Sequence, residues 1–113
     1  MITVIGIKSC DTCRKALAWL SAQKTDHQYH DLRADGLDEK RLKGWIKACG
    51  WEAVLNRRST TWRGLGDAEK ANVDADSALR LMLAHPTLVK RPVFEIGPAV
   101  YVGFSDSVRE ALA

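Results

Sequence analysis

The sequence predicts an α/β fold in which both ends of the chain build a mixed four-stranded sheet and a helical region is inserted between them. Two observations lead to this prediction. The chain opens with a strand, helix and strand pattern, and it closes with two short apolar runs followed by a helix. A strand–helix–strand start favours a right-handed crossover, and therefore a parallel pair of strands.

The N-terminal segment is expected to supply the first two strands. "ITVIG" (2–6) is rich in β-branched residues and predicts a strand. From Asp11 onward, apolar residues recur at helical spacing, which predicts a helix to about Lys24. "QYHDL" (28–32) is expected to form a second short strand before Gly36 breaks the chain.

The middle of the chain is predicted to form helices separated by a loop. "DEKRLKGWIKAC" (38–49) predicts an amphipathic helix, with Cys49 as a small buried hydrophobic residue. Residues 56–67 are polar and rich in turn formers, which predicts a loop. "DADSALRLMLAHP" (74–86) predicts another helix, capped by its first or second aspartate and stopped by its final proline.

The C-terminal segment is expected to complete the sheet. Residues 93–96 and 99–102 are apolar and flank a Gly-Pro pair, which predicts a hairpin, and "SDSVREALA" (105–113) predicts a capped final helix. This order of elements, with a C-x-x-C motif near a βαβ pattern, is that of a thioredoxin-like fold. We predict one domain over 1–113. Its thioredoxin-type parts are about 1–35 and 86–113, and its helical insertion is about 37–85.

The composition is that of an ordinary globular domain, with 46% hydrophobic and 27% charged residues among 113. The net charge of +3, without a long run of cations, gives no argument for direct nucleic-acid binding. No apolar run is long enough to span a bilayer, and the N-terminus lacks the features of a secretory signal. We therefore expect a cytoplasmic monomer that does not bind membranes.

The stretch "KSCDTCRK" (8–15) is the main chemical signal in the sequence. Cys10 falls at the junction of the first strand and the first helix, where unpaired N–H groups, the helix dipole and neighbouring cations favour a thiolate. We expect the Cys10 pKa to lie below about 8.5. The N–H groups of Asp11, Thr12 and Cys13 are expected to cradle a bound oxyanion.

Cys13 lies three residues further on, on the same helical face. If Cys10 formed a mixed disulfide, Cys13 could resolve it by thiol–disulfide exchange. A C-x-x-C pair can also arise by coincidence or belong to a metal site. A structural zinc site needs four ligands, and the three histidines are scattered along the chain, so we expect no metal.

Arg57 in the polar loop and Arg91 before Pro92 are candidate anion-binding residues. Planar guanidinium groups suit phosphate-like oxyanions. The residue before a proline favours an extended backbone, and a proline similar to the cis-proline of thioredoxin folds would hold Arg91 near the thiol. The alternative is that the loop arginines are solvated surface charges, as most arginines are.

Several segments, in order, carry a resemblance to a known family: "VIGIKSCDT", "VLNR", "TTWR", "LMLAHP", "VKRPVFE" and "VGF". Over nearly its whole length the chain resembles the ArsC/Spx family, and most of all its YffB-type branch. The resemblance implies a thioredoxin-like fold with an inserted helical region. Arsenate reductases of this family use a nucleophilic cysteine at the position of Cys10, and glutathione with glutaredoxin completes the reduction.

The resemblance also bears on the anion-binding residues. Arg57 and Arg91 match two of the three arginines that hold the oxyanion in these arsenate reductases, and the third lies near "VGF", where this chain has Phe104. Cys13 is a second difference, because those enzymes usually lack it. Spx-type regulators have the C-x-x-C pair as a redox switch and bind the RNA polymerase alpha C-terminal domain.

We therefore expect an enzyme, a glutathione-linked thiol oxidoreductase of the ArsC family with Cys10 as nucleophile and Cys13 as resolving thiol. No bound cofactor is implied; glutathione is the expected co-substrate and glutaredoxin a candidate partner. Two alternatives are open. One is a glutaredoxin-dependent arsenate reductase acting on arsenate or another small anion. The other is a Spx-like, redox-switched regulator that binds RNA polymerase.

Overall fold

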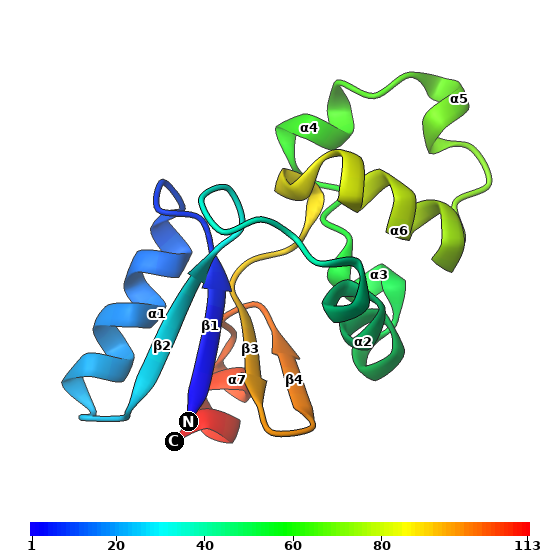
Figure 1. Cartoon of the computed structure of the whole chain (residues 1–113). Helices are drawn as coiled ribbons and strands as arrows, with labels where there is room; N and C mark the ends of the chain where they lie inside the picture. The colour runs from blue at the N-terminus through cyan, green and yellow to red at the C-terminus, as the bar shows by residue number, and fades with distance from the viewer. The chain divides into compact units, whose positions relative to one another are not determined.

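The computed structural model describes all residues from 1 to 113. They divide into two compact units, one made of Met1–Gly36 with Arg91–Ala113 and the other of Leu37–Lys90. The first unit contains the sheet and the second is helical (Figure 1). That residues 1–113 form one domain with an insertion at about 37–85 stays a prediction.

The first unit is built on a four-stranded mixed sheet with the strand order β2–β1–β3–β4. β1 (Ile2–Gly6) pairs in parallel with β2 (His27–Asp31) and antiparallel with β3 (Val93–Ile96). β3 forms the predicted hairpin with β4 (Ala99–Val102). The sheet confirms the predicted fold class. β2 lies one residue earlier than predicted, and the other three strands have their predicted bounds.

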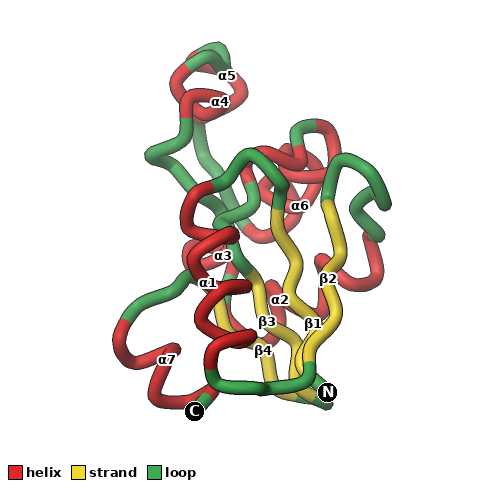
Figure 2. The backbone as a smooth tube through the Cα atoms, turned by 90° about the vertical axis from the view of Figure 1, so that its left-hand side faces the viewer, coloured by secondary structure: helices red, strands yellow, loops and turns green.

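Two helices, α1 (Asp11–Ala22) and α7 (Asp106–Leu112), lie on the same side of the sheet (Figure 2). Alternate residues of a strand point to the same face, so Ile2 and Val4 of β1 meet these helices. The resulting core consists of Ile2, Val4, Ala16, Leu20, Phe94, Val108 and Leu112. α7 begins after Ser105, whose hydroxyl accepts a 3.4 Å hydrogen bond from the N–H of Val108.

The second unit packs short helices around one apolar centre. Its elements are α2 (Glu39–Cys49), α3 (Trp51–Val54), α4 (Thr60–Arg63), α5 (Asp67–Lys70), α6 (Ala75–Ala84) and the 3-10 helix Pro86–Leu88. Its buried side chains include Leu42, Trp45, Val54, Ala78, Met82 and Leu88. Asp38 caps α2, and Asp74, the first of the two aspartates considered, caps α6 through the N–H of Ser77 at 2.8 Å.

Two expectations for this unit were wrong. The predicted loop 56–67 contains the whole of α4, which starts where the Ser59 hydroxyl accepts a 3.2 Å hydrogen bond from the N–H of Trp62. A helix of one turn has no apolar periodicity to reveal it, and only its serine cap was visible. Cys49 is half-buried rather than buried, because it lies in the last turn of α2.

None of the helices combines the length and the apolar character that crossing a membrane would require.

Candidate active site

Cys10 occupies the N-cap position of α1, with an extended backbone at φ −84° and ψ 118°. The four residues Ile7–Cys10 form a turn, closed by a 3.0 Å hydrogen bond from the Cys10 N–H to the Ile7 carbonyl. The turn leads directly from β1 into α1, so the half-buried Cys10 side chain stands where the helix has unpaired N–H groups. The structure thus places Cys10 at the predicted strand–helix junction.

The environment of Cys10 favours its thiolate. Burial by itself would raise the Cys10 pKa. The N–H and S–H groups of Cys13, the positive charge of Arg91 and the N–H of Thr12 outweigh burial and bring the pKa below its ordinary value. Cys10 is therefore the thiol of this pair that ionises first.

Cys13 has the opposite character. Its side chain is 1% exposed, and burial raises the pKa of its thiol to about 12. The N–H of Ile7 and the charge of Arg91 oppose this rise, while the hydrogen bond to Cys10 and the Cys10 charge add to it. Cys13 thus stays protonated and donates its S–H to the Cys10 sulfur. The two thiols therefore differ in pKa and in burial, and the C-x-x-C spacing alone does not show this difference.

Gly6, at the end of β1, makes room for Cys13. A Cβ at position 6 would lie 2.6 Å from Cys13 Sγ and 3.1 Å from its Cβ. Such separations are below van der Waals contact, so a side chain at position 6 and the buried thiol exclude one another. The strand and the helix start can approach this closely only because residue 6 is glycine.

Arg91 and Pro92 belong to the C-terminal segment of the sheet unit, Arg91–Ala113. The Arg91–Pro92 peptide bond is cis, and Pro92 is buried just before β3. The Arg91 charge lowers the pKa of both Cys10 and Cys13, which places its guanidinium within electrostatic range of the pair. Its Nε is buried and has no hydrogen-bond partner. Arg91 is therefore a cation with a free donor beside Cys10.

The remaining predicted residues lie as follows. Thr12 is exposed and contributes its backbone N–H to the Cys10 site. The Asp11 carboxylate is exposed and forms an ion pair with Arg14 one turn along α1. No group of three or more histidine, cysteine, aspartate or glutamate side chains is arranged to hold a metal ion. In the first unit the structure therefore gathers Cys10, Cys13, Thr12 and Arg91.

Arg57 belongs to the helical unit and has its own surroundings there. Its guanidinium lies over the Trp51 ring, 5.7 Å from the centroid, in a cation–π contact. It lines a cavity of about 500 Å³ together with Glu52, Ala53, Leu55, Asn56, Arg58 and Lys90. Cations outnumber carboxylates in this lining, so the cavity suits an anion. Sequence reasoning singled out Arg57 but did not identify Lys90.

Phe104, at the position near "VGF", is part of the packing of the sheet unit. Its ring lies 5.6 Å from that of Trp19 and 6.2 Å from that of Phe94, measured between centroids. The Arg109 guanidinium covers the same ring at 4.8 Å. Phe104 offers an anion no fork of N–H donors, in contrast to an arginine.

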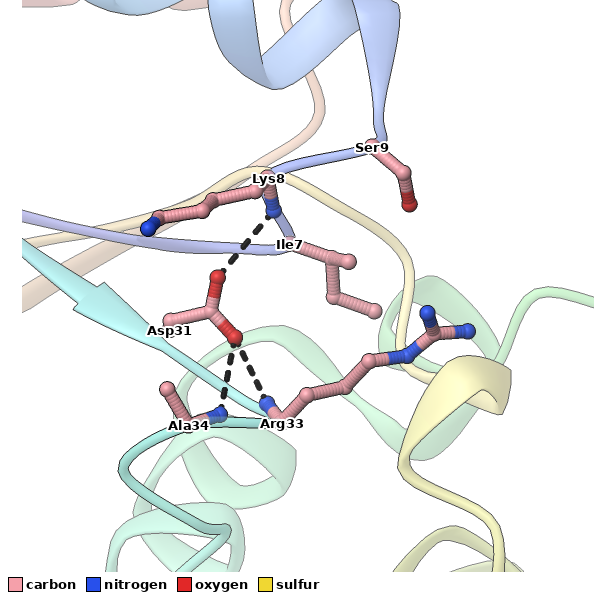
Figure 3. Close-up of a pocket in the computed structure, with 6 residues that line it drawn as sticks. All are labelled: Ile7, Lys8, Ser9, Asp31, Arg33 and Ala34. Carbon is pink, nitrogen blue, oxygen red and sulfur yellow. Dashed lines mark hydrogen bonds between the residues drawn. The ribbon is translucent and has the colours of Figure 1, made fainter.

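Asp31, at the end of β2, is a site residue that sequence reasoning missed (Figure 3). It is 5% exposed, and its carboxylate accepts hydrogen bonds from the N–H groups of Lys8, Arg33 and Ala34 and from the Tyr29 hydroxyl. The Ala34 N–H, followed by the other three donors, overcomes burial and lowers the Asp31 pKa from 3.8 to about 2. The sequence feature that could have indicated this residue is an aspartate at the end of the predicted strand.

The Asp31 carboxylate is expected to make the fold sensitive to acid. Because its pKa is lower in the folded protein, its stabilisation is complete above the unfolded value of 3.8 and is lost as the pH falls toward about 2. Asp31→Asn should therefore lower the free energy of unfolding by about 1.5–3 kcal/mol near neutral pH. Urea unfolding measured across this range tests the prediction: the difference from the wild-type protein should shrink below pH 3.8, and a constant difference would contradict it.

The sheet order and the C-x-x-C pair at the start of α1 define the class: this is a thioredoxin-like α/β protein. Residues 5–112 match the model of the ArsC family, and the chain belongs to that family. Both findings confirm the family and the fold that the sequence motifs suggested.

Similar proteins agree with this assignment. A solved structure of the YffB protein is 45% identical, covers 100% of both chains and has a TM-score of 0.95. An arsenate reductase (ArsC) related protein from Brucella melitensis is 45% identical, covers 97% of this chain and 92% of its own, and has a TM-score of 0.80. The global transcriptional regulator Spx of Streptococcus pyogenes is 28% identical over 100% of this chain and 86% of its own.

Proposed function

We propose that this protein is a cytoplasmic, glutathione-linked thiol oxidoreductase in which the Cys10 thiolate is the nucleophile. The observation that carries the proposal is the unlike character of the two thiols. Cys10 has a lowered pKa at a helix start, and Cys13 is buried, protonated and hydrogen-bonded to it. Membership of the ArsC family supports the same chemistry.

The first step is attack of the Cys10 thiolate on one sulfur of a glutathione disulfide. The new S–S bond joins Cys10 to glutathione, the old S–S bond breaks, and the second glutathione leaves as a thiolate that takes a proton from solvent. The Cys10 sulfur is oxidised and the departing sulfur is reduced. A lowered Cys10 pKa raises the fraction of thiolate available for this attack.

The second step is resolution by Cys13. Once Cys10 carries glutathione, it no longer holds a negative charge or accepts the S–H, so two of the causes that raise the Cys13 pKa are removed. Cys13 then loses its proton to solvent and attacks the Cys10 sulfur. A Cys10–Cys13 disulfide forms, and the remaining glutathione leaves as a thiolate. The net change is one glutathione disulfide reduced and one dithiol oxidised.

Two arginines are proposed to bind anionic groups. Arg91 has a buried Nε without a partner and a charge within range of Cys10, so it can bind a carboxylate of a glutathione attached there. Arg57 is proposed to bind an anionic group in the cation-lined cavity of its own unit, which it shares with Arg58 and Lys90. Glutaredoxin is the proposed protein partner.

Arsenate reduction is the second candidate, favoured by the similarity to the arsenate reductase (ArsC) related protein from Brucella melitensis. In that case the Cys10 thiolate would attack arsenate, with Arg91 on its oxygens, and Arg57 is the second candidate arginine. Phe104 has no guanidinium with which to bind a third arsenate oxygen, which weakens this candidate. A redox-switched regulator is the third candidate, favoured by the similarity to Spx, and binding to the RNA polymerase alpha C-terminal domain would test it.

Intact-mass measurement after exposure to oxidised glutathione tests the proposal. The wild-type protein is expected to form an internal disulfide, whereas Cys13→Ser should trap one glutathione on Cys10; Cys49→Ser, the matched control, should behave as the wild-type protein does. If Cys10 proves no more reactive than Cys49, the proposal fails. If excess arsenate blocks the adduct on Cys13→Ser, arsenate reduction becomes the first candidate.

A further inference from the structure

Asp31 is a buried carboxylate that is hydrogen-bonded to the turn before Cys10 and that the proposed reaction does not use. We propose that Asp31 is a positioning residue for Cys10: its carboxylate fixes the Ile7–Cys10 turn, and this turn sets the Cys10 sulfur against the first N–H groups of α1. The proposal goes beyond the proposed function, because it concerns the reactivity of Cys10 toward any electrophile.

The carboxylate joins two separate segments of the chain. On the side of its own strand, Asp31 Oδ1 accepts hydrogen bonds from the N–H groups of Arg33 at 2.8 Å and Ala34 at 3.0 Å. Asp31 Oδ2 accepts from the Lys8 N–H at 3.1 Å, across 23 residues of sequence. Figure 3 shows both oxygens engaged in this way. Asp31 thus ties the end of β2 to the turn before Cys10.

The Ile7–Cys10 turn acts on both thiols. Lys8 is its second residue, and its last residue, Cys10, closes it through the 3.0 Å bond to the Ile7 carbonyl. The Ile7 N–H is directed at the Cys13 sulfur, where it lowers the pKa of that thiol. A shift of the Lys8 backbone would therefore move the Cys10 sulfur relative to the N–H groups that stabilise its thiolate.

A carboxylate is the side chain that this position requires. Asp31 Oδ2 accepts from two donors, the Lys8 N–H and the Tyr29 hydroxyl at 2.9 Å. An asparagine with its oxygen facing Arg33 and Ala34 would turn its NH₂ toward Lys8 and Tyr29. The Tyr29 hydroxyl can rotate to accept a hydrogen bond, but the Lys8 N–H cannot, so its donor would be left unsatisfied.

The charged groups around Asp31 do not replace these hydrogen bonds. The side chains of Lys8 and Arg33 line the same cavity of about 360 Å³, and the Arg33 guanidinium extends away from the carboxylate (Figure 3). Asp35 accepts a 2.9 Å hydrogen bond from the Asp31 N–H and so holds the backbone of the same bend. Asp31 is thus held by hydrogen bonds from N–H and O–H donors rather than by an ion pair. Because hydrogen bonds depend on angle as well as distance, they fix the position of the carboxylate.

The sharpest test removes the Lys8 N–H and leaves every side chain unchanged, although the same ester also makes the Ile7 carbonyl a weaker acceptor for the Cys10 N–H. Residues 1–9, made with an ester in place of the Ile7–Lys8 amide, can be ligated to 10–113 through the thiol of Cys10 itself. The all-amide chain made in the same way is the control. Alkylation of Cys10 by iodoacetamide, followed by peptide mass mapping across pH, reports the reactivity. We expect the ester to slow Cys10 about 3- to 10-fold at slightly acid pH and to move the midpoint of its pH profile upward.

Asp31→Asn should reproduce this change, whereas Asp35→Asn, which removes a carboxylate from the same bend, should leave the Cys10 profile in place. A general loosening of the bend would instead move the profile in both variants. If the ester chain folds and its Cys10 profile coincides with that of the control, the proposal is wrong, whatever Asp31→Asn does to stability. Failure of Cys10 to react with oxidised glutathione in the control chain would count against the proposed function alone.

Discussion

Cys10→Ser is expected to remove the glutathione adduct completely and to lower any thiol-dependent turnover by at least about 1000-fold. A serine hydroxyl is not ionised at neutral pH and forms no S–S bond, so no other group at the start of α1 can take over the attack. Cys13 cannot replace it, because its side chain is 1% exposed and an external disulfide cannot reach its sulfur. Turnover with a small disulfide and intact-mass measurement of the adduct give the two readouts.

The dependence of alkylation on pH separates Cys10 from the other thiols. The Cys10 pKa is lowered and the Cys49 pKa is raised by burial, so Cys10 should react at least about tenfold faster than Cys49 at neutral pH. The ratio should fall as the pH rises and Cys49 also ionises, and Cys13 should remain unmodified. Equal rates for Cys10 and Cys49 at neutral pH would remove the basis for Cys10 as the nucleophile.

Gly6→Ala is expected to destabilise the protein by about 2 kcal/mol, through overpacking against Cys13. The new Cβ would lie 2.6 Å from Cys13 Sγ, and the thiol has no solvent into which it can rotate because it is 1% exposed. The start of α1 must therefore move away from β1, which would also disturb the pairing of Cys13 with Cys10. Urea unfolding measures the loss of stability.

A double mutant and a matched glycine make this prediction specific. Adding Cys13→Ala removes the sulfur that lies 2.6 Å away, so it should recover part of the lost stability; the Cys13 Cβ at 3.1 Å limits the recovery. Gly44→Ala, within α2 and with nothing within 4 Å of its new Cβ, should instead be neutral or stabilising by up to about 1 kcal/mol. Equal costs at positions 6 and 44 would show that the clash with Cys13 is not the cause.

Several features of the fold could be predicted because they depend on neighbours along the chain. The β-branched run before Gly6, the serine or aspartate caps and the proline after α6 act within a few residues, and the corresponding elements lie within two residues of their predicted ends. The place of Cys10 is equally local, because a strand followed at once by a helix puts the residue between them at the helix N-terminus. The motifs also sufficed to identify the ArsC family.

The sequence by itself thus determined the order of the elements, the family and the place of Cys10 at the start of α1. Only the tertiary structure decided how that cysteine differs from its neighbour. Cys13 is buried against Gly6 from β1, and Asp31 reaches the Lys8 N–H from the end of β2. The burial and the hydrogen bonds of a side chain depend on which distant segments pack against it. The C-x-x-C spacing does not show which segments pack against each of the two cysteines.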